Sequence, residues 1–374
     1  MQIEILLDMR TLSSSLFLAL SILLLFSSCD KNKNNNTDGY NRKAMLENYA
    51  DKLIIPAYAQ LQQKANTLKT AADNFTQQPD NTTLLNFQNA WKETAKTFQF
   101  CNSFNFGPAE TLTGNFTIDV ATFPVNETLT EDFVSQMANN GFDPLNNFSR
   151  DTRGIYGIEY LIFKNDAAQT ISNFSDEKRK NYLTAIITDF KTRTDKVTAD
   201  WQLYRTTFVA ADGTDAGSGA SMLFNQFLIG FENNKNFKLG LPLGLRVGQT
   251  TTAPNKVAAY YSGISTELVK LNFESTMQIY FGNDFENQQG LGFDDYLKSV
   301  DSGEALVSET ITQMNKVKDA INNIPQGKLS DVIVSDFAKP DAAHTEMAKL
   351  TRYIKSDMSS LLGLSITFSS GDGD

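Results

Sequence analysis

Two side chains with metal-binding chemistry stand three positions apart in residues 153–163, which read RGIYGIEYLIF. Tyr156 offers a phenol and Glu159 offers a carboxylate. Side chains three apart on a helix project from the same face, so this spacing allows both groups to hold one cation. A tyrosine near its ordinary pKa of about 10 is protonated and binds metal poorly, although iron(III) accepts a phenolate ligand. The stretch is therefore a weak candidate for a metal site, with Glu159 and Tyr156 as ligands.

Few other residues offer catalytic chemistry. The chain has a single histidine, His344, so zinc enzymes that use two or three histidines are excluded. This histidine lacks plausible serine and aspartate partners in its sequence context, so we predict no Ser-His-Asp set. Phosphate-binding loops and dinucleotide fingerprints do not occur in the sequence either. We assign no catalytic residue. The formal net charge of −10 argues against nucleic acid as a partner.

Three further groups have both a functional and a structural interpretation. Arg246 is the charged side chain in the apolar middle of KLGLPLGLRVG, where it either contacts a ligand or forms a structural pair. Asp294 and Asp295 offer carboxylate oxygens, but an aspartate after Gly-Phe and before a short helix more often caps that helix. His344 is expected to lie on the surface or to pack, because Glu346, two residues on, projects from a different helix face.

Residues 1–28 are predicted to form a signal peptide rather than part of the fold. The apolar stretch 12–26 is shorter than the about 20 residues that span a membrane comfortably. Two serines and Cys29 follow it, an ending that resembles the lipobox of bacterial lipoproteins. In such proteins the cysteine is acylated and becomes the first residue. The alternative is an ordinary secretory signal with an incidental cysteine.

Residues 29–41 are polar and rich in asparagine, which predicts a flexible tether. A lipid on Cys29 would hold the folded part beside a membrane and outside the cytoplasm. We therefore expect an envelope lipoprotein that faces the periplasm or the cell surface, on either the inner or the outer membrane. Cys101 would be the one cysteine left in the mature chain, so no internal disulfide is predicted.

The mature chain has the pattern of an all-α protein. Apolar residues recur every three or four positions over 42–72 and again over about 81–103, as they do in amphipathic helices. Pro56 interrupts the first run and is expected to kink it. Residues 109–128 are rich in threonine and are predicted to be irregular. Further helices are predicted over about 129–139, 152–163, 175–208, 220–233, 254–282, 302–323 and 340–361.

The tract ADGTDAGSGAS, residues 211–221, is the clearest break in the second half of the chain. We predict two consecutive helical bundle domains, 42–210 and 219–374, with a linker over 211–218. Each bundle would bury the apolar stripes of its own helices. Three phenylalanines after the linker fall at helical spacing and are expected in the core: Phe224, Phe227 and Phe231.

Several tracts occur in an order that is typical of one protein family. They are NYADKLIIPAYAQL, AWKETAKTFQF, FNFGP, IDVATFP and RGIYGIEYLIF, followed by GLPLGLRVG, AYYSGIS and GFDDYL. Together they resemble the imelysin family of bacterial envelope proteins over nearly all of residues 42–374. The resemblance implies a two-domain all-α protein that is linked to iron acquisition. It also implies the peptidase activity for which the family was named.

The resemblance further implies a metal signature, Gly-x-His-x-x-Glu on a helix, which this chain breaks. Gly154 and Glu159 match the signature, but Tyr156 stands at the histidine position. The arginine and glutamate that the family has near positions 95 and 102 are Ala95 and Asn102 here. The remaining glutamate supplies one or two oxygens where a divalent ion takes about four to six ligands. Iron or zinc would therefore bind weakly, and no cofactor is assigned with certainty.

We expect a ligand pocket where the two domains meet, since clefts between domains are the usual place for such sites. Its candidate residues are Tyr156, Glu159, Asn102 and Arg246. The buried Glu159 carboxylate would pair with a cation such as Arg153 or Arg246, of which Arg246 would reach it across the domain interface. The leading hypothesis is a membrane-anchored lipoprotein that binds a ligand in iron uptake, with iron-uptake components as partners. The alternatives are a metallopeptidase and a structural or interaction protein of the envelope.

Overall fold

The structure is a computed structural model that describes residues 39–111, 115–139, 141–145 and 149–368. These residues belong to one compact unit. The predicted signal peptide, the acylation of Cys29 and nearly all of the predicted tether lie outside the described residues. Among the described residues, no helix combines the length and the apolar character needed to cross a membrane.

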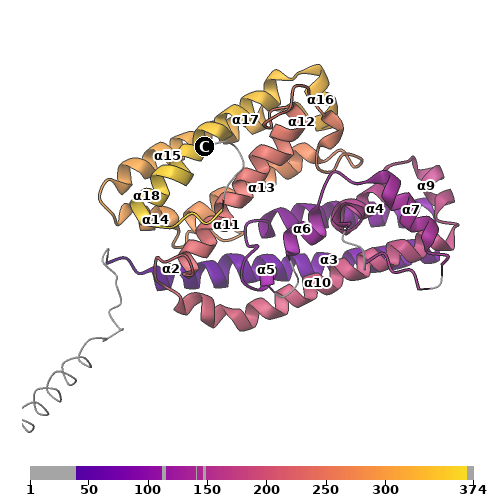
Figure 1. The fold of residues 1–374 in the computed structure, drawn as a ribbon, viewed down its shortest axis with the longest axis horizontal. Coiled ribbons are helices and arrows are strands. Elements are labelled where there is room, and N and C mark those ends of the chain that lie inside the picture. Colours follow the sequence, from indigo (N-terminus) through magenta and orange to yellow (C-terminus); the bar gives the residue numbers. More distant parts are fainter. Residues whose placement is uncertain (1–38, 112–114, 140, 146–148, 369–374) are drawn as a thin grey trace, which may run out of the picture. The chain divides into compact units, whose positions relative to one another are not determined.

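All regular secondary structure in the described ranges is helical, which confirms the predicted all-α class (Figure 1). The long helices predicted in the first half occur within a few residues of their expected bounds, and two short helices, α5 and α6, lie in the stretch predicted to be irregular. The helices of the first half are α2 (Arg42–Asn48), the π-helix η1 (Tyr49–Ile54), α3 (Ile55–Gln77), α4 (Asn81–Cys101), α5 (Pro108–Thr111), α6 (Phe116–Ala121), α7 (Glu127–Gln136), the 3-10 helix η2 (Arg150–Thr152), α8 (Gly154–Phe163), α9 (Ala167–Asn173) and α10 (Glu177–Ala210).

The expected kink at Pro56 takes the form of a π-helical turn. Pro56 lies in the first turn of α3, directly after η1. Inside an α-helix, a proline ring collides with the carbonyl group four residues earlier and leaves that carbonyl without its usual donor. The wider π-helical turn before Pro56 changes this hydrogen-bond register. The helical run therefore continues from Arg42 to Gln77 with a local change of winding.

The second half contains further helices and two more π-helical turns. One continuous helix was predicted over 340–361, but in the structure this segment contains a π-helix between two α-helices. The helices are α11 (Gly219–Asn233), the π-helix η3 (Asn234–Gly240), α12 (Leu241–Leu243), the 3-10 helix η4 (Pro254–Lys256), α13 (Ser265–Phe281), α14 (Phe293–Lys298), α15 (Gly303–Asn322), α16 (Leu329–Ser335), α17 (Ala338–Thr351), the π-helix η5 (Arg352–Asp357) and α18 (Met358–Leu362).

The helix predicted over 254–282 was wrong in its first half. The α-helix begins only at Ser265, after the short η4 and a series of turns. Ala259 has a φ of 57° and Gly263 a φ of 74°, and these left-handed conformations interrupt any right-handed helix. The turn that results brings the backbone N–H of Ser262 to the carboxylate of Glu159.

The long helices pack side by side. In the first half, α3 packs along both α4 and α10, and α8 lies against α4 and α10 (Figure 1). In the second half, α15 packs against α13 and α17. Helix α13 also packs against α4, so the two groups of helices share an interface. The predicted phenylalanine core is confirmed, since Phe224, Phe227 and Phe231 are fully buried.

The predicted linker is a loop between α10 and α11, and its backbone is held in place. The N–H of Gly219 donates to the carbonyl of Ala211 at 2.7 Å. Nε of Arg42 donates to the carbonyl of Asp212 at 2.7 Å. In Figure 1, α11 lies above α10. The division into two domains stays a prediction, because the described residues cluster as one unit.

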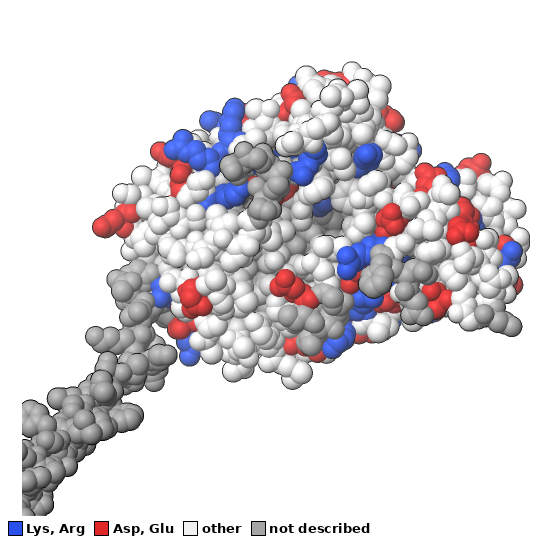
Figure 2. Space-filling model, in the orientation of Figure 1, with Lys and Arg blue, Asp and Glu red and all other residues white. Residues whose placement is uncertain are grey.

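Acidic and basic side chains are interspersed over the face shown in Figure 2, and neither sign dominates it. The distribution of charges on this face does not test whether nucleic acid is a partner. The prediction that it is not a partner is based on the overall charge of −10.

Candidate functional site

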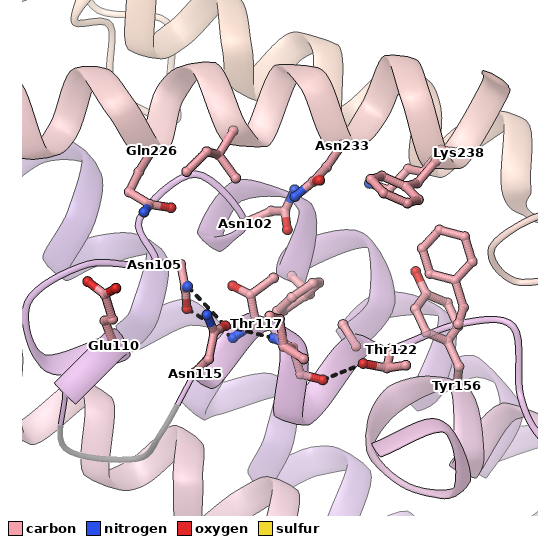
Figure 3. Close-up of a pocket in the computed structure, with 16 residues that line it drawn as sticks. Asn102, Asn105, Glu110, Asn115, Thr117, Thr122, Tyr156, Gln226, Asn233 and Lys238 are labelled. Atoms are coloured by element: carbon pink, nitrogen blue, oxygen red, sulfur yellow. Dashed lines mark hydrogen bonds between the residues drawn. The ribbon is translucent and has the colours of Figure 1, made fainter. Parts of the chain in front are cut away.

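A cavity of about 510 Å³ lies between the helices of the first half and the continuous helix formed by α11 and η3 (Figure 3). This volume is within the range of about 300–1,000 Å³ that is usual for small-molecule sites. One wall comes from the end of α4, from α5, α6 and α8, and from the loops between them. The lining residues are Phe98, Asn102, Asn105, Glu110, Asn115, Thr117, Ile118, Ala121, Thr122, Phe123, Tyr156, Gln226, Ile229, Asn233, Phe237 and Lys238.

Two asparagines make part of this wall rigid. Nδ2 of Asn105 donates to Oδ1 of Asn115 at 3.0 Å, and Oδ1 of Asn105 accepts from the N–H of Thr117 at 3.0 Å. Oδ1 of Asn115 also accepts from the N–H of Ile118 at 3.1 Å, which caps α6. These hydrogen bonds hold the start of α6 against the loop after α4, so the wall is formed before any ligand binds.

Two polar atoms in the cavity wall lack hydrogen-bond partners within the described part of the chain. They are Oε1 of Gln226, on α11, and Oγ1 of Thr117, on α6, and both are buried. Their side chains come from opposite walls (Figure 3). A buried polar atom without a partner costs about 1–3 kcal/mol. Because both residues line the cavity, a rotation of either terminal group would bring its oxygen to a polar ligand there.

Lys238 lies at the other end of the cavity from Gln226 (Figure 3). Its residue is only 6% exposed, and its Nζ donates a hydrogen bond to Oε1 of Gln99 on α4. The burial of this amine lowers its pKa from the ordinary 10.5 to about 7. Lys238 belongs to the π-helical turn η3. Such turns change the direction of the side chains that follow and are frequent at functional sites.

Tyr156 and Phe123 form a partition between two cavities. Both residues line the large cavity, and both also line a second one of about 160 Å³. Their rings pack edge to face with centroids 5.3 Å apart, and Tyr156 is only 2% exposed. Glu159 lines the smaller cavity and not the large one. The structure therefore brings Tyr156 and Asn102 into one cavity and places Glu159 behind their wall.

Glu159 is held by the backbone of a distant turn. Its Oε1 accepts from the N–H of Ser262 at 2.7 Å, and the residue is 1% exposed. Burial raises the pKa of Glu159 from the ordinary 4.5 to about 7, and the hydrogen bonds from Ser262 oppose this rise. The carboxylate thereby fixes the turn between η4 and α13 to helix α8.

The glycine of the signature is explained by packing. Gly154 has a φ of 67°, and a Cβ atom there would lie 2.3 Å from the carbonyl oxygen of Val120 on α6. Only glycine fits so close an approach of two backbones. Nε1 of Trp91 donates to the carbonyl of Ile155 at 2.7 Å, which fixes the start of α8 against α4. Gly154 is thus required for the position of α8 whether or not a metal binds.

The side chains present do not fit a metal ion. Burial and the nearby Glu159 raise the pKa of Tyr156 well above its ordinary value, so its phenol is protonated at neutral pH. Glu159 already accepts a hydrogen bond from Ser262. Within the described ranges, no three His, Cys, Asp or Glu side chains come together as a possible ligand group. A glutamate and a neutral phenol do not form the ligand set of a divalent ion or of a metallopeptidase.

Titration calorimetry with zinc, iron(II) and iron(III) is therefore expected to show no site tighter than about 1 μM, which corresponds to about −8 kcal/mol. The physical reason is the small number of ligands that Glu159 and Tyr156 supply. A submicromolar site that disappears in both Tyr156→Phe and Glu159→Ala would contradict this expectation. It would show that a tyrosinate had replaced the histidine as a working ligand.

The predicted pairing of Glu159 with Arg246 does not form. Glu159 is bound by Ser262, and Arg246 lines neither of the two cavities. The Arg246 guanidinium lies over the ring of Phe237, 4.6 Å from its centroid, and its backbone N–H donates to Gln249. Helix α12 ends at Gly244 in a left-handed turn, and Arg246 lies in the loop after it.

The remaining candidates have structural partners. Oδ2 of Asp295 accepts from the N–H of Gly292 at 3.2 Å, and Asp294 forms an ion pair of 2.6 Å with Lys298. The aspartates therefore stabilise the start of α14, in line with the capping interpretation. His344 is partly buried, and burial lowers its pKa. Its ring would lie 3.2 Å from a Cβ atom at Gly240, so it packs against η3.

Sequence reasoning missed most polar residues of the cavity region, which are Lys238, Gln226, Gln99, Thr117, Asn105, Asn115 and Glu110. A signal was available for Gln226 but not for Lys238, which follows the polar run 232–236. Residues 219–231 form a largely apolar stretch, and a helix of that kind is buried. Its polar side chains must then be buried too and need partners or a function. Gln99 gave no such signal, because it lies on an ordinary amphipathic helix.

Comparisons with known proteins agree with this fold. The family model described as imelysin matches residues 54–355. A protein of Synechococcus elongatus called "Iron-regulated protein A" is 20% identical over 272 residues, which are 70% of this chain and 69% of that protein.

Two crystal structures are also similar. An iron-regulated protein A precursor from Parabacteroides distasonis has a TM-score of 0.70 and 17% identity, over 89% of this chain and 97% of the other. An imelysin-like protein from Psychrobacter arcticum has a TM-score of 0.68 and 20% identity, over 87% of this chain and 97% of the other. At these identities the structures show a shared fold. Because the family model covers most of the sequence, this chain belongs to the imelysin family.

Proposed function

We propose that this protein is a membrane-anchored lipoprotein that binds a small polar molecule in the cavity between α6 and α11, as a component of iron uptake. The observation that carries the proposal is the pair of unpaired polar atoms, Oε1 of Gln226 and Oγ1 of Thr117, in a cavity of about 510 Å³. Convergent polar groups of this kind favour a binding role over a purely structural one.

The link to iron and to the membrane has separate support. The Synechococcus elongatus and Parabacteroides distasonis proteins carry the name iron-regulated protein A, and this chain shares their family or fold. The apolar stretch 12–26 and Cys29 support acylation and envelope localisation. Mass spectrometry of the native N-terminus tests the anchor, since an acylated Cys29 carries the mass of its lipid.

Binding in the cavity is tested by a substitution that fills it. Ala121 lines the cavity, and Ala121→Phe would place a ring inside it. Ala71→Phe is the matched control, because Ala71 is also partly buried but lines a separate groove between α3 and α4. Native mass spectrometry of protein from its own envelope is expected to show a bound small molecule. The molecule should be lost in Ala121→Phe and retained in Ala71→Phe.

The iron link is tested by growth of the source bacterium under iron limitation. A strain that lacks the protein is expected to grow poorly when iron is chelated. Wild type and Ala71→Phe should restore growth, and Ala121→Phe should not. If all three proteins restore growth equally, ligand binding in the cavity is not needed for iron uptake. The cavity could then still bind a small molecule, but the proposed link to iron would be wrong.

A further inference from the structure

We propose that the Lys238 end of the cavity binds the carboxylate of a small organic acid. This inference rests on the proposed binding function and specifies the charge of the ligand. The carboxylate would form an ion pair with Nζ of Lys238 in place of, or in addition to, the hydrogen bond to Gln99.

Among the residues that the structure describes, Lys238 has no carboxylate as a counter-ion. Buried charges in proteins are normally paired, because an isolated charge in an apolar surrounding is strongly unfavourable. Within the described residues, the amine of Lys238 has the neutral amide of Gln99 as its partner and no carboxylate. Nε2 of Gln99 donates to the carbonyl of Ala95 at 2.9 Å, which fixes its Oε1 toward Lys238. The lysine is thus held in position beside the cavity without a charge to balance it.

The same π-helical turn contains a second buried lysine, Lys235. Lys235, three residues earlier, is equally buried at 6% exposure. It forms an ion pair of 3.1 Å with Glu232 and a hydrogen bond of 3.1 Å with Thr351. The chain therefore supplies a carboxylate to the buried lysine that faces the protein interior. It supplies none to Lys238, the buried lysine that faces the cavity.

The rest of the wall restricts the body of the ligand. Gln226 presents an unpaired acceptor, so the ligand should carry a hydroxyl or amino donor. Gln226 and Lys238 are separated by about 18 Å along the helix, at about 1.5 Å per residue, so the ligand is elongated if it contacts both. Glu110 lines the end of the cavity near Gln226 (Figure 3), and a second carboxylate there would meet a like charge. The preferred class is a monocarboxylate with a distant hydroxyl or amine.

The test uses a panel of hydroxy- and amino-monocarboxylates of graded length, each paired with its primary amide. Affinities are measured by thermal shift and by calorimetry on wild type, Lys238→Met and Lys256→Met. Lys256 is an exposed lysine that lines the smaller cavity, so its variant controls for the loss of one positive charge. We expect acids to bind about 10- to 100-fold more tightly than their amides, as hydrogen bonds to charged groups do. Lys238→Met should abolish this difference, and Lys256→Met should not.

The outcomes separate this inference from the proposed function. If acids and amides bind equally and both are blocked by Ala121→Phe, the cavity is a binding site but the carboxylate assignment is wrong. If no acid binds wild type more tightly than its amide, or if the preference survives in Lys238→Met, the assignment is also overturned. Circular dichroism of Lys238→Met checks that the helices are intact.

Discussion

Lys238→Met is expected to stabilise the protein by about 2–4 kcal/mol at neutral pH. Burial lowers the pKa of Lys238 from 10.5 to about 7, and a difference of this size corresponds to about 4–5 kcal/mol of stability lost at and below pH 7. Methionine has a similar length and no charge to desolvate. The loss of the hydrogen bond to Gln99 offsets about 1–2 kcal/mol of the gain.

The pH dependence of this effect has a defined sign. Between pH 7 and 10.5 the unfolded chain binds a proton at this lysine and the folded chain does not, so wild-type stability rises with pH. The methionine variant lacks this contribution, and its advantage should shrink over that window. Urea unfolding followed by circular dichroism at pH 7 and at pH 10 measures the difference.

Lys235→Met is the matched control for this prediction. It removes a lysine of equal burial from the same turn, but one whose partner is Glu232. Removing one member of a buried ion pair usually destabilises a protein by about 3–5 kcal/mol. The two lysine variants should therefore change stability in opposite directions. A destabilised Lys238→Met would mean that its amine has a charged partner in the folded protein.

Glu159→Gln is expected to stabilise the protein by about 2–3 kcal/mol at pH 8 and to leave it nearly unchanged at pH 4.5. The folded-state pKa of Glu159 is about 7 and its ordinary value is 4.5. An acid with a raised pKa contributes stability that is present below pH 4.5 and is lost as the pH rises through 7, here about 3 kcal/mol in all. Glutamine keeps the acceptor for the N–H of Ser262 and has no charge to bury.

Glu159→Ala distinguishes the hydrogen bond from the charge. Alanine leaves the buried N–H of Ser262 without its acceptor and creates a void, so the variant should be less stable than wild type at pH 5 by about 2–4 kcal/mol. Urea unfolding between pH 4.5 and 8 measures all three proteins. Parallel stability curves for wild type and Glu159→Gln would show that Glu159 does not titrate in this range.

The sequence was sufficient for features that depend on neighbouring residues. Apolar spacing along 42–72 and 175–208 predicted helices, because helix periodicity is a local property. The break at 211–218 was found from its Gly, Asp and Ser content. The replacement of histidine by Tyr156 in a family signature was also visible, and it predicts that metal ligands are scarce there.

Interruptions of local pattern were harder to predict. The turn before α13 lies in a stretch whose composition permits a helix, and its left-handed Ala259 has no sequence signature. Non-glycine residues adopt that conformation only when surrounding contacts stabilise it. Here the turn directs the N–H of Ser262 to Glu159, which is a contact between segments 103 residues apart.

Only the tertiary structure decided which side chains form the cavity and which charges are balanced. The sequence suggested that Arg246 would neutralise Glu159, but packing brings Ser262 there and leaves Arg246 over Phe237. Lys238 meets Gln99 across 139 residues of sequence, where η3 passes the end of α4. The sequence determines the helices because each turn is stabilised within a few residues. It does not by itself reveal partners for buried polar groups, since these depend on how distant helices pack.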